Sequence, residues 1–456
     1  MLRAFVNIFR IHDLRRKVFI TLLLLAACRI GAHVPTPGVN GAALEDYFTK
    51  QAGALGGTLL GFINMFSGGA FARATVLALG IMPYISASII LQLLTAVVPS
   101  LERLAKEEGE EGRRKITQYT RYGTVLLCAF QGYFMAGYIE GLSSTAGRMG
   151  VETAIIAQGG LGFRVITALT MMVGTMFLMW VGEQISERGI GNGISLIITV
   201  GIISRIPVAL QDTWRNLSLI DPASRTLQPY VLLILLSMFV AVVMGIIMVT
   251  RGQRRIPVQY AKRIVGRRIY SGQQSYLPLR VNYAGVIPII FASSLLMFPA
   301  TLAQFFPSVG VLTWMRNMLS PGTAAYLVMF TTLIIFFSYF WTATQFDPVK
   351  MSNDMKKNGA FIPGKRPGKP TAEFLDRTMN RLVLSGALFL AGIAVLPTLI
   401  TKGFSGVNLS MAQYFGGTGL LIIVGVMLDT MGSVESHLLM RHYDGFMKKG
   451  RLRGRY

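Results

Sequence analysis

The chain has 456 residues, of which 52% are hydrophobic and only 14% are charged. This composition excludes an ordinary soluble domain, in which about a quarter of the residues are charged. A net charge of +23 is typical of proteins that bind polyanions, but here the basic residues alternate with apolar runs and do not form one basic domain. The composition therefore indicates a protein embedded in a membrane.

Ten predominantly apolar segments follow one another along the chain, and each has about 20 residues, enough to cross a hydrocarbon core as a helix. We place them at residues 18–36, 74–98, 117–139, 161–183, 190–209, 230–250, 284–303, 324–346, 382–400 and 416–434. Basic residues 15–17 before the first segment are also typical of a signal peptide, but nine further segments favour a retained anchor. The sequence thus predicts an all-α membrane protein with ten transmembrane helices.

Positive charge is concentrated on one side of these segments. Of the 44 Lys and Arg residues, 34 belong to the two tails and to the connections 2/3, 4/5, 6/7 and 8/9, whereas 9 belong to the other connections. By the positive-inside rule the first set is cytoplasmic, as are both termini. Because five is an odd number, two sets of five helices would have opposite orientations, which is the arrangement of an inverted repeat.

Two of the cytoplasmic connections, residues 251–282 and 347–381, carry eight basic residues each, and the first has no acidic residue. Alternating apolar and polar residues in the first connection predict a short projecting hairpin. Membrane topology and attraction to anionic lipid explain such charge. Docking of ribosomal RNA or of an acidic protein surface explains it as well, and the residues alone leave both explanations open.

Residues 59–72 form an apolar segment that is too short to span a membrane and is interrupted by Gly68 and Gly69. A re-entrant or pore-inserted element fits this pattern, and so does an amphipathic turn on the membrane surface. In the next segment, Pro83 removes a helix hydrogen bond and crowds the preceding turn. We therefore expect the second span to be bent at Pro83.

The chain lacks the residue patterns of an enzyme or a metal site. No apolar segment has a cluster of Asp, Glu, His or Lys near its middle, as a proton relay or coupling-ion site requires. The four histidines lie at or outside the membrane boundaries without metal-ligand spacing, and no nucleophile–base pair is apparent. We expect no catalytic activity, no metal and no cofactor.

Seven runs of residues are long enough to carry a resemblance to a known family. They are NMFSGGA (64–70), ALGIMPYISASII (78–90), GRRKITQYTRYGT (112–124), GTMFLMWVGEQISERGIGNGIS (174–195), RGQRRIPVQYAKR (251–263), AGVIPIIFASSLLMFPAT (284–301) and KKNGAFIPGKRPGKPT (356–371). Together they resemble the SecY family, the channel subunits of the bacterial protein translocase. The resemblance covers all ten segments and is weakest in the outer loops and the C-terminal tail.

The resemblance implies an hourglass channel built from two pseudo-symmetric inverted five-helix halves with a re-entrant plug helix. The halves would be residues 1–209 and 230–434, hinged at the outer connection 210–229 and followed by a cytoplasmic tail, residues 435–456. The channel would open across the membrane and also sideways, between spans 2 and 7. It would pass unfolded preproteins and release their apolar segments into lipid.

The resemblance also assigns residues to the pore. The constriction would consist of Ile81, Ile85, Ile194, Ile198, Ile290 and Ile422, and the plug, at about 59–72, would include Phe62, Asn64, Met65, Phe66, Gly68 and Gly69. Two of the isoleucine pairs are four residues apart, which puts each pair on one helix face. Taken without the family, isoleucines at this spacing usually face lipid or the protein core.

The family further assigns the two basic connections to docking of the SecA motor ATPase and the ribosome. The matching residues are Arg254, Arg255, Lys262, Arg267, Arg268 and Arg366, and Gln92 would be a polar residue of the lateral gate. The resemblance implies the small membrane subunits SecE and SecG as further partners, and the bacterial inner membrane as the location. An inverted-repeat secondary transporter is the alternative, and it would need a binding site at the membrane centre.

Overall fold

The computed structural model describes residues 11–50, 59–146, 154–217, 228–260, 263–265, 268–270, 274–305, 310–320, 322–404, 407 and 409–449. The predicted docking residues Lys262 and Arg267, residues 218–227 of the predicted hinge and residues 450–456 of the predicted tail lie outside this part of the chain.

Helices make up most of the described chain, and each of the ten apolar segments contains one. The helices of the first half are α2 (His12–Gly31), α3 (Gly41–Lys50), α5 (Leu59–Phe66), α6 (Met82–Val97), α7 (Pro99–Lys106), α8 (Gly109–Ala146), α9 (Leu161–Arg188), α10 (Gly193–Ile203) and α11 (Ile206–Leu217). Those of the second half are α12 (Pro229–Arg251), α13 (Ile287–Phe305), α14 (Gly310–Met318), α15 (Ala324–Gln345), α16 (Pro348–Lys357), α17 (Lys369–Gly403), α18 (Leu409–Gly416) and α19 (Thr418–Lys449).

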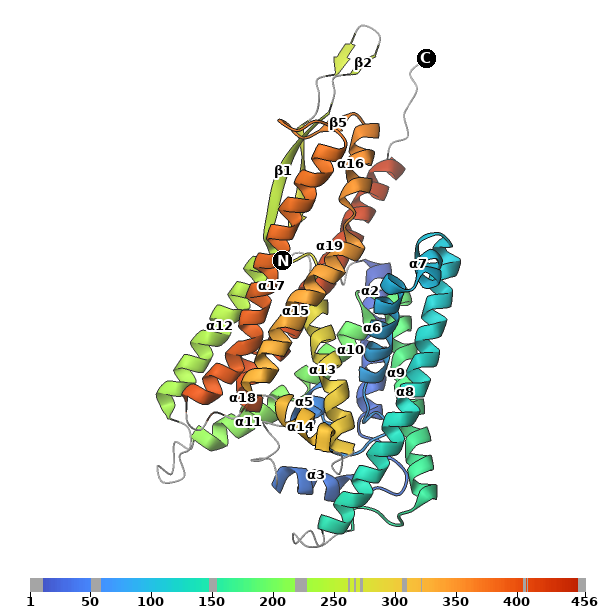
Figure 1. The fold of residues 1–456 in the computed structure, drawn as a ribbon, viewed down its shortest axis with the longest axis vertical. Coiled ribbons are helices and arrows are strands. Elements are labelled where there is room, and N and C mark those ends of the chain that lie inside the picture. Colours follow the sequence, from blue (N-terminus) through green and yellow to red (C-terminus); the bar gives the residue numbers. More distant parts are fainter. Residues whose placement is uncertain are drawn as a thin grey trace.

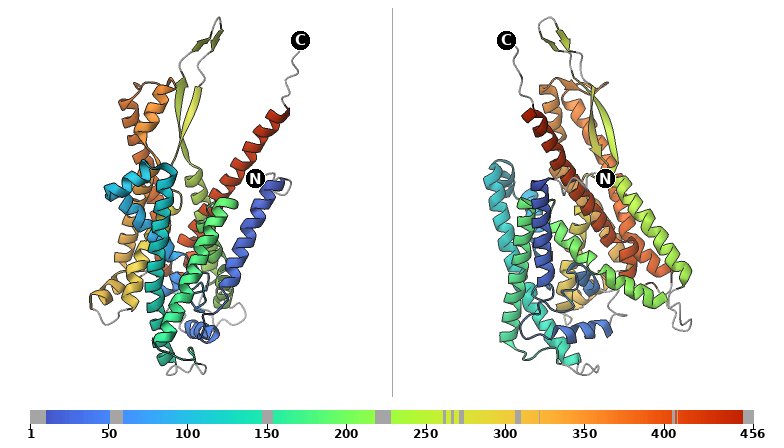
Figure 2. Two further views of the ribbon diagram at one scale, coloured as in Figure 1. Left: turned by 90° about the vertical axis from the view of Figure 1, so that its right-hand side faces the viewer. Right: turned by 180° about the vertical axis from the view of Figure 1, so that it is seen from behind.

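The described residues include seven helices that are long and apolar enough to cross a membrane, and an eighth if α6 and α7 are one span bent by 104°. Figures 1 and 2 show the long helices running roughly side by side, with α3 and α11 lying across their lower end. The opposite end carries a projecting β-hairpin and the last turns of α19. The protein is therefore an α-helical, multi-pass membrane protein.

Helices α10 and α13 lie at the centre of the bundle (Figure 1), between the N-terminal helices and the C-terminal ones. Helix α10 contacts α9 on one side and α19 on the other, while α13 contacts both α6 and α15. Helices α10 and α13, together with the contact of α11 with α18, pack the two groups against each other. A movement of one group against the other must alter these contacts.

The second span begins later than the apolar segment predicts, and the expected bend at Pro83 is wrong. Residues 74–81 form turns, with Gly80 at φ 60°, and α6 starts at Met82. Pro83 therefore lies in the first turn of α6, where its missing N–H has no helical partner to lose. The turns are held in place by hydrogen bonds from Thr175 Oγ1 to Gly80 O (3.1 Å) and from Thr36 Oγ1 to Ala74 O (2.8 Å).

The predicted projecting hairpin is confirmed. Strand β1 (Gln253–Tyr260) pairs antiparallel with β4 (Gln274–Arg280), and a small outer ladder joins β2 (Arg263–Val265) to β3 (Arg268–Tyr270). The sequence did not predict that β5 (Ala360–Phe361), from the second basic connection, pairs with the other edge of β1. One three-stranded sheet of order β4-β1-β5 thus joins the two connections.

The sheet is anchored on the helices by its apolar face. Ile256 and Leu279, from β1 and β4, are buried in one cluster with Leu375 and Met379 of α17. Helix α17 begins 13 residues before the predicted ninth span at residue 382, so that its first turns support the sheet. The prediction missed this extension because hydropathy marks the part of a helix inside lipid and not the helix itself.

Candidate functional site

The six isoleucines assigned to the constriction converge in the structure. Five of them are at most 5% exposed and belong to one apolar cluster, and the half-buried Ile194 packs against it. They come from four places in the chain, namely the start of α6, α10, α13 and α19. The apolar cluster therefore joins the two groups of helices across the middle of the bundle.

Local geometry sets the direction of each isoleucine pair. Asn192 caps α10, because its Oδ1 accepts hydrogen bonds from the backbone N–H groups of Ile194 (3.1 Å) and Ser195 (3.2 Å). Ile194 is therefore in the first turn of α10, with Ile198 one turn further on the same face. Ile81 precedes α6 and its carbonyl accepts from the N–H of Ile85 at 3.1 Å, which aligns the second pair in the same way.

The polar groups beside the constriction are satisfied within their own helices. The hydroxyls of Ser293 and Ser294 both donate to the carbonyl of Ile290, at 2.9 and 2.7 Å. Branched apolar side chains are stiff at χ1, and a ring of them resists ion flow because water leaves a narrow apolar passage. The cluster can therefore act as a dry gasket with no fixed polar site for a small solute.

The apolar segment before α6 is inserted into the bundle. Helix α5 contacts α10 and α13, and Met65 and Phe66 at its end are 6% and 7% exposed and belong to the same cluster as the isoleucines. This burial favours a pore-inserted element over a turn on the membrane surface. The side chain of Phe62 lies outside what the structure describes.

A tight turn closes this element after Phe66. The Asn64 carbonyl accepts from Gly69 N (2.9 Å) and its side-chain Oδ1 accepts from Ala72 N (3.1 Å). Gly68 and Gly69 have φ of 65° and 91°, the left-handed region that a side chain would strain. The turn also touches α10 closely, since a Cβ on Gly201 would lie 2.7 Å from the Phe66 carbonyl oxygen.

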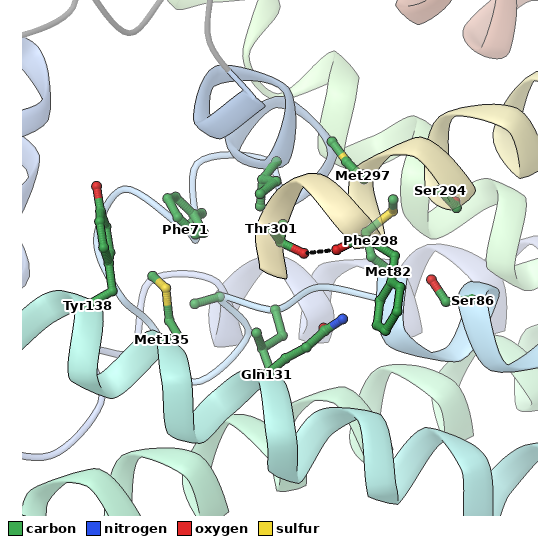
Figure 3. A pocket seen from close by; sticks show the side chains of 13 residues that line it. Phe71, Met82, Ser86, Gln131, Met135, Tyr138, Ser294, Met297, Phe298 and Thr301 are labelled. Carbon is green, nitrogen blue, oxygen red and sulfur yellow. Dashed lines mark hydrogen bonds between the residues drawn. The ribbon is translucent and has the colours of Figure 1, made fainter. Parts of the chain in front are cut away.

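An apolar cavity lies between α6, α8, α13 and the segment 59–72 (Figure 3), with an empty volume of about 610 Å³ that includes space open to solvent. Its wall is apolar, as at Met82 and Met297, and Gln131 and Ser86 add polar groups. No sequence pattern marks this cavity, because its residues come from four separate segments. Gln92, the predicted gate residue, is not among the lining residues; its amide donates to Ser88 Oγ on α6 at 3.2 Å.

The predicted docking residues gather at the sheet end of the molecule. Arg254 and Arg255 are exposed on β1, and Arg366 is exposed in the turn after β5. That turn is fixed by hydrogen bonds from Thr371 Oγ1 to Arg366 O and from Ser352 Oγ to Gly368 O, both 2.7 Å. Arg268 lies in β3, and its side chain is outside what the structure describes.

The described residues hold no group of three or more His, Cys, Asp or Glu side chains that could bind a metal ion. The fold and the site define a multi-pass helical membrane protein whose central helices meet in a buried apolar cluster, with a short helix inserted against it. The SecY family model matches residues 75–431 of this chain. The chain belongs to the SecY family.

Curated relatives extend the match over the whole chain. The protein translocase subunit SecY of Chlamydia trachomatis serovar D is 48% identical and the alignment covers 98% of this chain and 99% of that protein. The SecY subunit of Thermus thermophilus is 45% identical, and the alignment covers 100% of this chain and 100% of that protein. The SecY subunit of Escherichia coli K12 is 44% identical, and the alignment covers 97% of this chain and 96% of that protein.

Solved structures share the fold at low sequence identity. One described as a protein conducting channel has a TM-score of 0.63 at 18% identity, over 92% of each chain. Sec61 from the canine ribosome-channel complex of the endoplasmic reticulum has a TM-score of 0.62 at 18% identity, also over 92% of each chain.

Proposed function

We propose that this chain is the central protein-conducting channel of the Sec translocon, which passes unfolded preproteins across the membrane. The observation that carries the proposal is the convergence of the six isoleucines, from four separated segments, in one buried apolar cluster at the centre of the bundle. Such a gasket yields to a wide chain while excluding small ions. A solute transporter would need polar groups there to hold its substrate.

The segment 59–72 is the plug of this channel. Its support is the burial of Met65 and Phe66 against the constriction and the contacts of α5 with α10 and α13. A related solved structure, 19% identical with a TM-score of 0.63, is described as showing that the plug domain of SecY stabilises the closed state and maintains a membrane seal. In this chain the plug blocks the side of the constriction that faces away from the basic sheet.

The lateral gate lies between α6 and α13, with the two halves, residues 1–209 and 230–434, moving about the outer connection 210–229. These two helices are in contact, and the cavity between them, α8 and the plug segment is lined mainly by apolar side chains. An apolar signal sequence or membrane segment would enter this cavity and continue into lipid. Gln92 faces Ser88 on α6 and has a role in the gate only after the helices part.

The sheet β4-β1-β5 is the docking surface for partners that supply the energy. Arg254, Arg255 and Arg366 expose positive charge there, suited to ribosomal RNA or to an acidic surface of SecA. Among the fold's relatives are ribosome-bound channels, canine Sec61 and yeast Ssh1. The charge asymmetry supports a cytoplasmic location for this end and for both termini. We infer a bacterial inner membrane as the location, and SecE and SecG as the small membrane subunits.

Crosslinking to a stalled preprotein tests the proposal. Cysteines are introduced singly at Ile85, Ile290 and, as a lipid-facing control, Leu236, which is 54% exposed on α12, after the two native cysteines have been replaced. We expect the arrested chain to crosslink to Ile85→Cys and Ile290→Cys and not to Leu236→Cys. A chain that crosslinked to the control as strongly as to the two constriction positions would refute the channel.

A further inference from the structure

Two arginines enclose the glycine turn of the plug segment. Arg29 of α2 donates from Nη2 to the Gly68 carbonyl over a long 3.4 Å, and a Cβ on Gly68 would lie 2.5 Å from Arg29 Nη1. The Arg205 guanidinium, just after α10, packs over Gly69, since a Cβ there would lie 3.2 Å from its Nη1. The two guanidinium groups therefore contact consecutive residues of one turn.

Neither arginine has a carboxylate partner among the described residues, whereas the neighbouring Arg73 is paired with Glu45 at 2.9 Å. Arg29 is half-buried and lines a small cavity with Phe66, Ser67 and Gly201. An arginine near the end of a membrane span ordinarily extends toward the headgroups and keeps its charge in water. Arg29 instead turns inward to the plug segment, where the Arg205 guanidinium packs over the adjacent Gly69.

Backbone geometry explains what compensates for this crowding. Gly68 has a left-handed φ and its carbonyl oxygen accepts from Arg29 Nη2, which gives the guanidinium an acceptor. The bare glycines also let both side chains approach the backbone. When the turn leaves, Arg29 loses this acceptor and Arg205 loses its packing against Gly69.

We propose that Arg29 and Arg205 are positioning residues that clasp the Gly68–Gly69 turn and hold the plug in the closed channel. The clasp rests on the proposed channel function, and it adds a specific retaining contact to the apolar packing of Met65 and Phe66. The clasp opens without any chemical step, because water replaces the turn as the partner of both guanidinium groups when the turn is displaced.

The test measures how readily the plug turn is exposed. Ser67→Cys is introduced without the native cysteines, and its labelling by a water-soluble maleimide is followed in proteoliposomes of the full chain with its partner subunits. Replacing Arg29 or Arg205 by Met keeps much of the side-chain length and removes the donors. We expect labelling to be roughly threefold to tenfold faster for each, the range for one hydrogen bond of ordinary net strength, because the Arg29 bond is long and Arg205 contacts the turn by packing.

Two controls separate a retaining contact from general damage. Arg164→Met removes another arginine, one paired with Glu140 at 2.7 Å away from the plug turn, and should leave the labelling rate unchanged. Arg29→Lys and Arg205→Lys keep a donor and should restore slow labelling. Resting ion conductance is measured on the same vesicles and should rise in the Met variants only.

Labelling and conductance of both Met variants equal to those of Arg164→Met would overturn the clasp. The channel function is tested apart from it, by SecA-driven transport of a preprotein through the unaltered protein in the same vesicles. Absence of that transport would refute the proposed function, whereas normal transport with unchanged labelling would refute the clasp alone.

Discussion

Gly201 is the position where one methyl group should open the closed channel. A Cβ there would lie 2.7 Å from the Phe66 carbonyl oxygen and 3.5 Å from Gly68 N. The first contact is 0.7 Å shorter than the 3.4 Å at which ordinary van der Waals contact begins, and the atom it meets belongs to backbone that cannot rotate away. In Gly201→Ala the plug turn must therefore move off α10.

The size of the effect follows from the cost of overpacking, which is about 1–3 kcal/mol for an extra methylene in a packed core. If displacement of the plug relieves this strain, the equilibrium between seated and displaced plug shifts by about 5- to 150-fold, the range that such energies correspond to. We expect Gly201→Ala to raise resting ion conductance in planar bilayers and to admit preproteins with defective signal sequences.

Gly392→Ala is the matched control, because a Cβ on Gly392 in α17 would meet no atom within 4 Å. In a helix this exchange stabilises by about 0.5–1 kcal/mol, so conductance should stay at the level of the unaltered protein. A Gly201→Ala protein that inserts normally and conducts no more than Gly392→Ala would show that the plug turn stays seated against α10, contrary to this prediction.

Three further predictions concern the plug and the docking surface. Deleting residues 62–70 should raise resting conductance or relax signal-sequence selectivity, and unchanged values of both in planar bilayers would remove the plug assignment. Arg366→Glu should reduce SecA-driven export about tenfold, because the new negative charge is repelled by an acidic surface of SecA, while the protein still inserts into the membrane. Normal export in a reconstituted assay would mean that the loop only sets the membrane topology. Gln259→Cys with Phe361→Cys should form a disulfide on oxidation, because these residues are opposite each other in the β1–β5 ladder. The control pair, Gln259→Cys with Ile362→Cys, should not. Equal crosslinking of both pairs on a gel would contradict the strand register.

What the sequence predicted correctly depends on local patterns. Every apolar segment contains a helix, and the alternation in residues 251–282 gives the hairpin β1–β4. The insertion of segment 59–72 also had a local signal, since it is too apolar for a solvated loop and too short to span. The error at the second span has the same origin, because apolar turns at 74–81 and an apolar helix have the same hydropathy.

Convergence of side chains had no local signal. Spacing alone aligned Ile81 with Ile85 and Ile194 with Ile198, and only the family resemblance joined these pairs to Ile290 on another helix. The pairing of β5 with β1 involves two residues about a hundred positions away in the chain, too short a strand for any periodicity to mark. The cavity beside α6 depends on how four segments pack, and such contacts follow from tertiary structure.

Only a short connection in the sequence separates the proposed docking surface from the helix that carries part of the proposed pore. Strand β4 ends at Arg280 and α13 begins at Ile287. Helix α13 carries Ile290 and one side of the proposed gate. The connection between them is packed and hydrogen-bonded: Val281 N donates to Gly252 O at 2.9 Å, Asn282 Nδ2 donates to Gly285 O at 3.1 Å, and Val281 O would lie 2.7 Å from a Cβ on Gly386.

A displacement of the sheet must therefore act on α13, because the linker has no slack to absorb it and packed contacts have few alternative arrangements. The six isoleucines have no titratable side chain, so a change of protonation within the proposed constriction cannot open it. The plug is held by a close glycine contact and by contacts to a backbone turn, both of which are lost together when the turn moves. A passive gate of this kind requires that the free energy for opening come from whatever binds the sheet or enters the cavity beside α6.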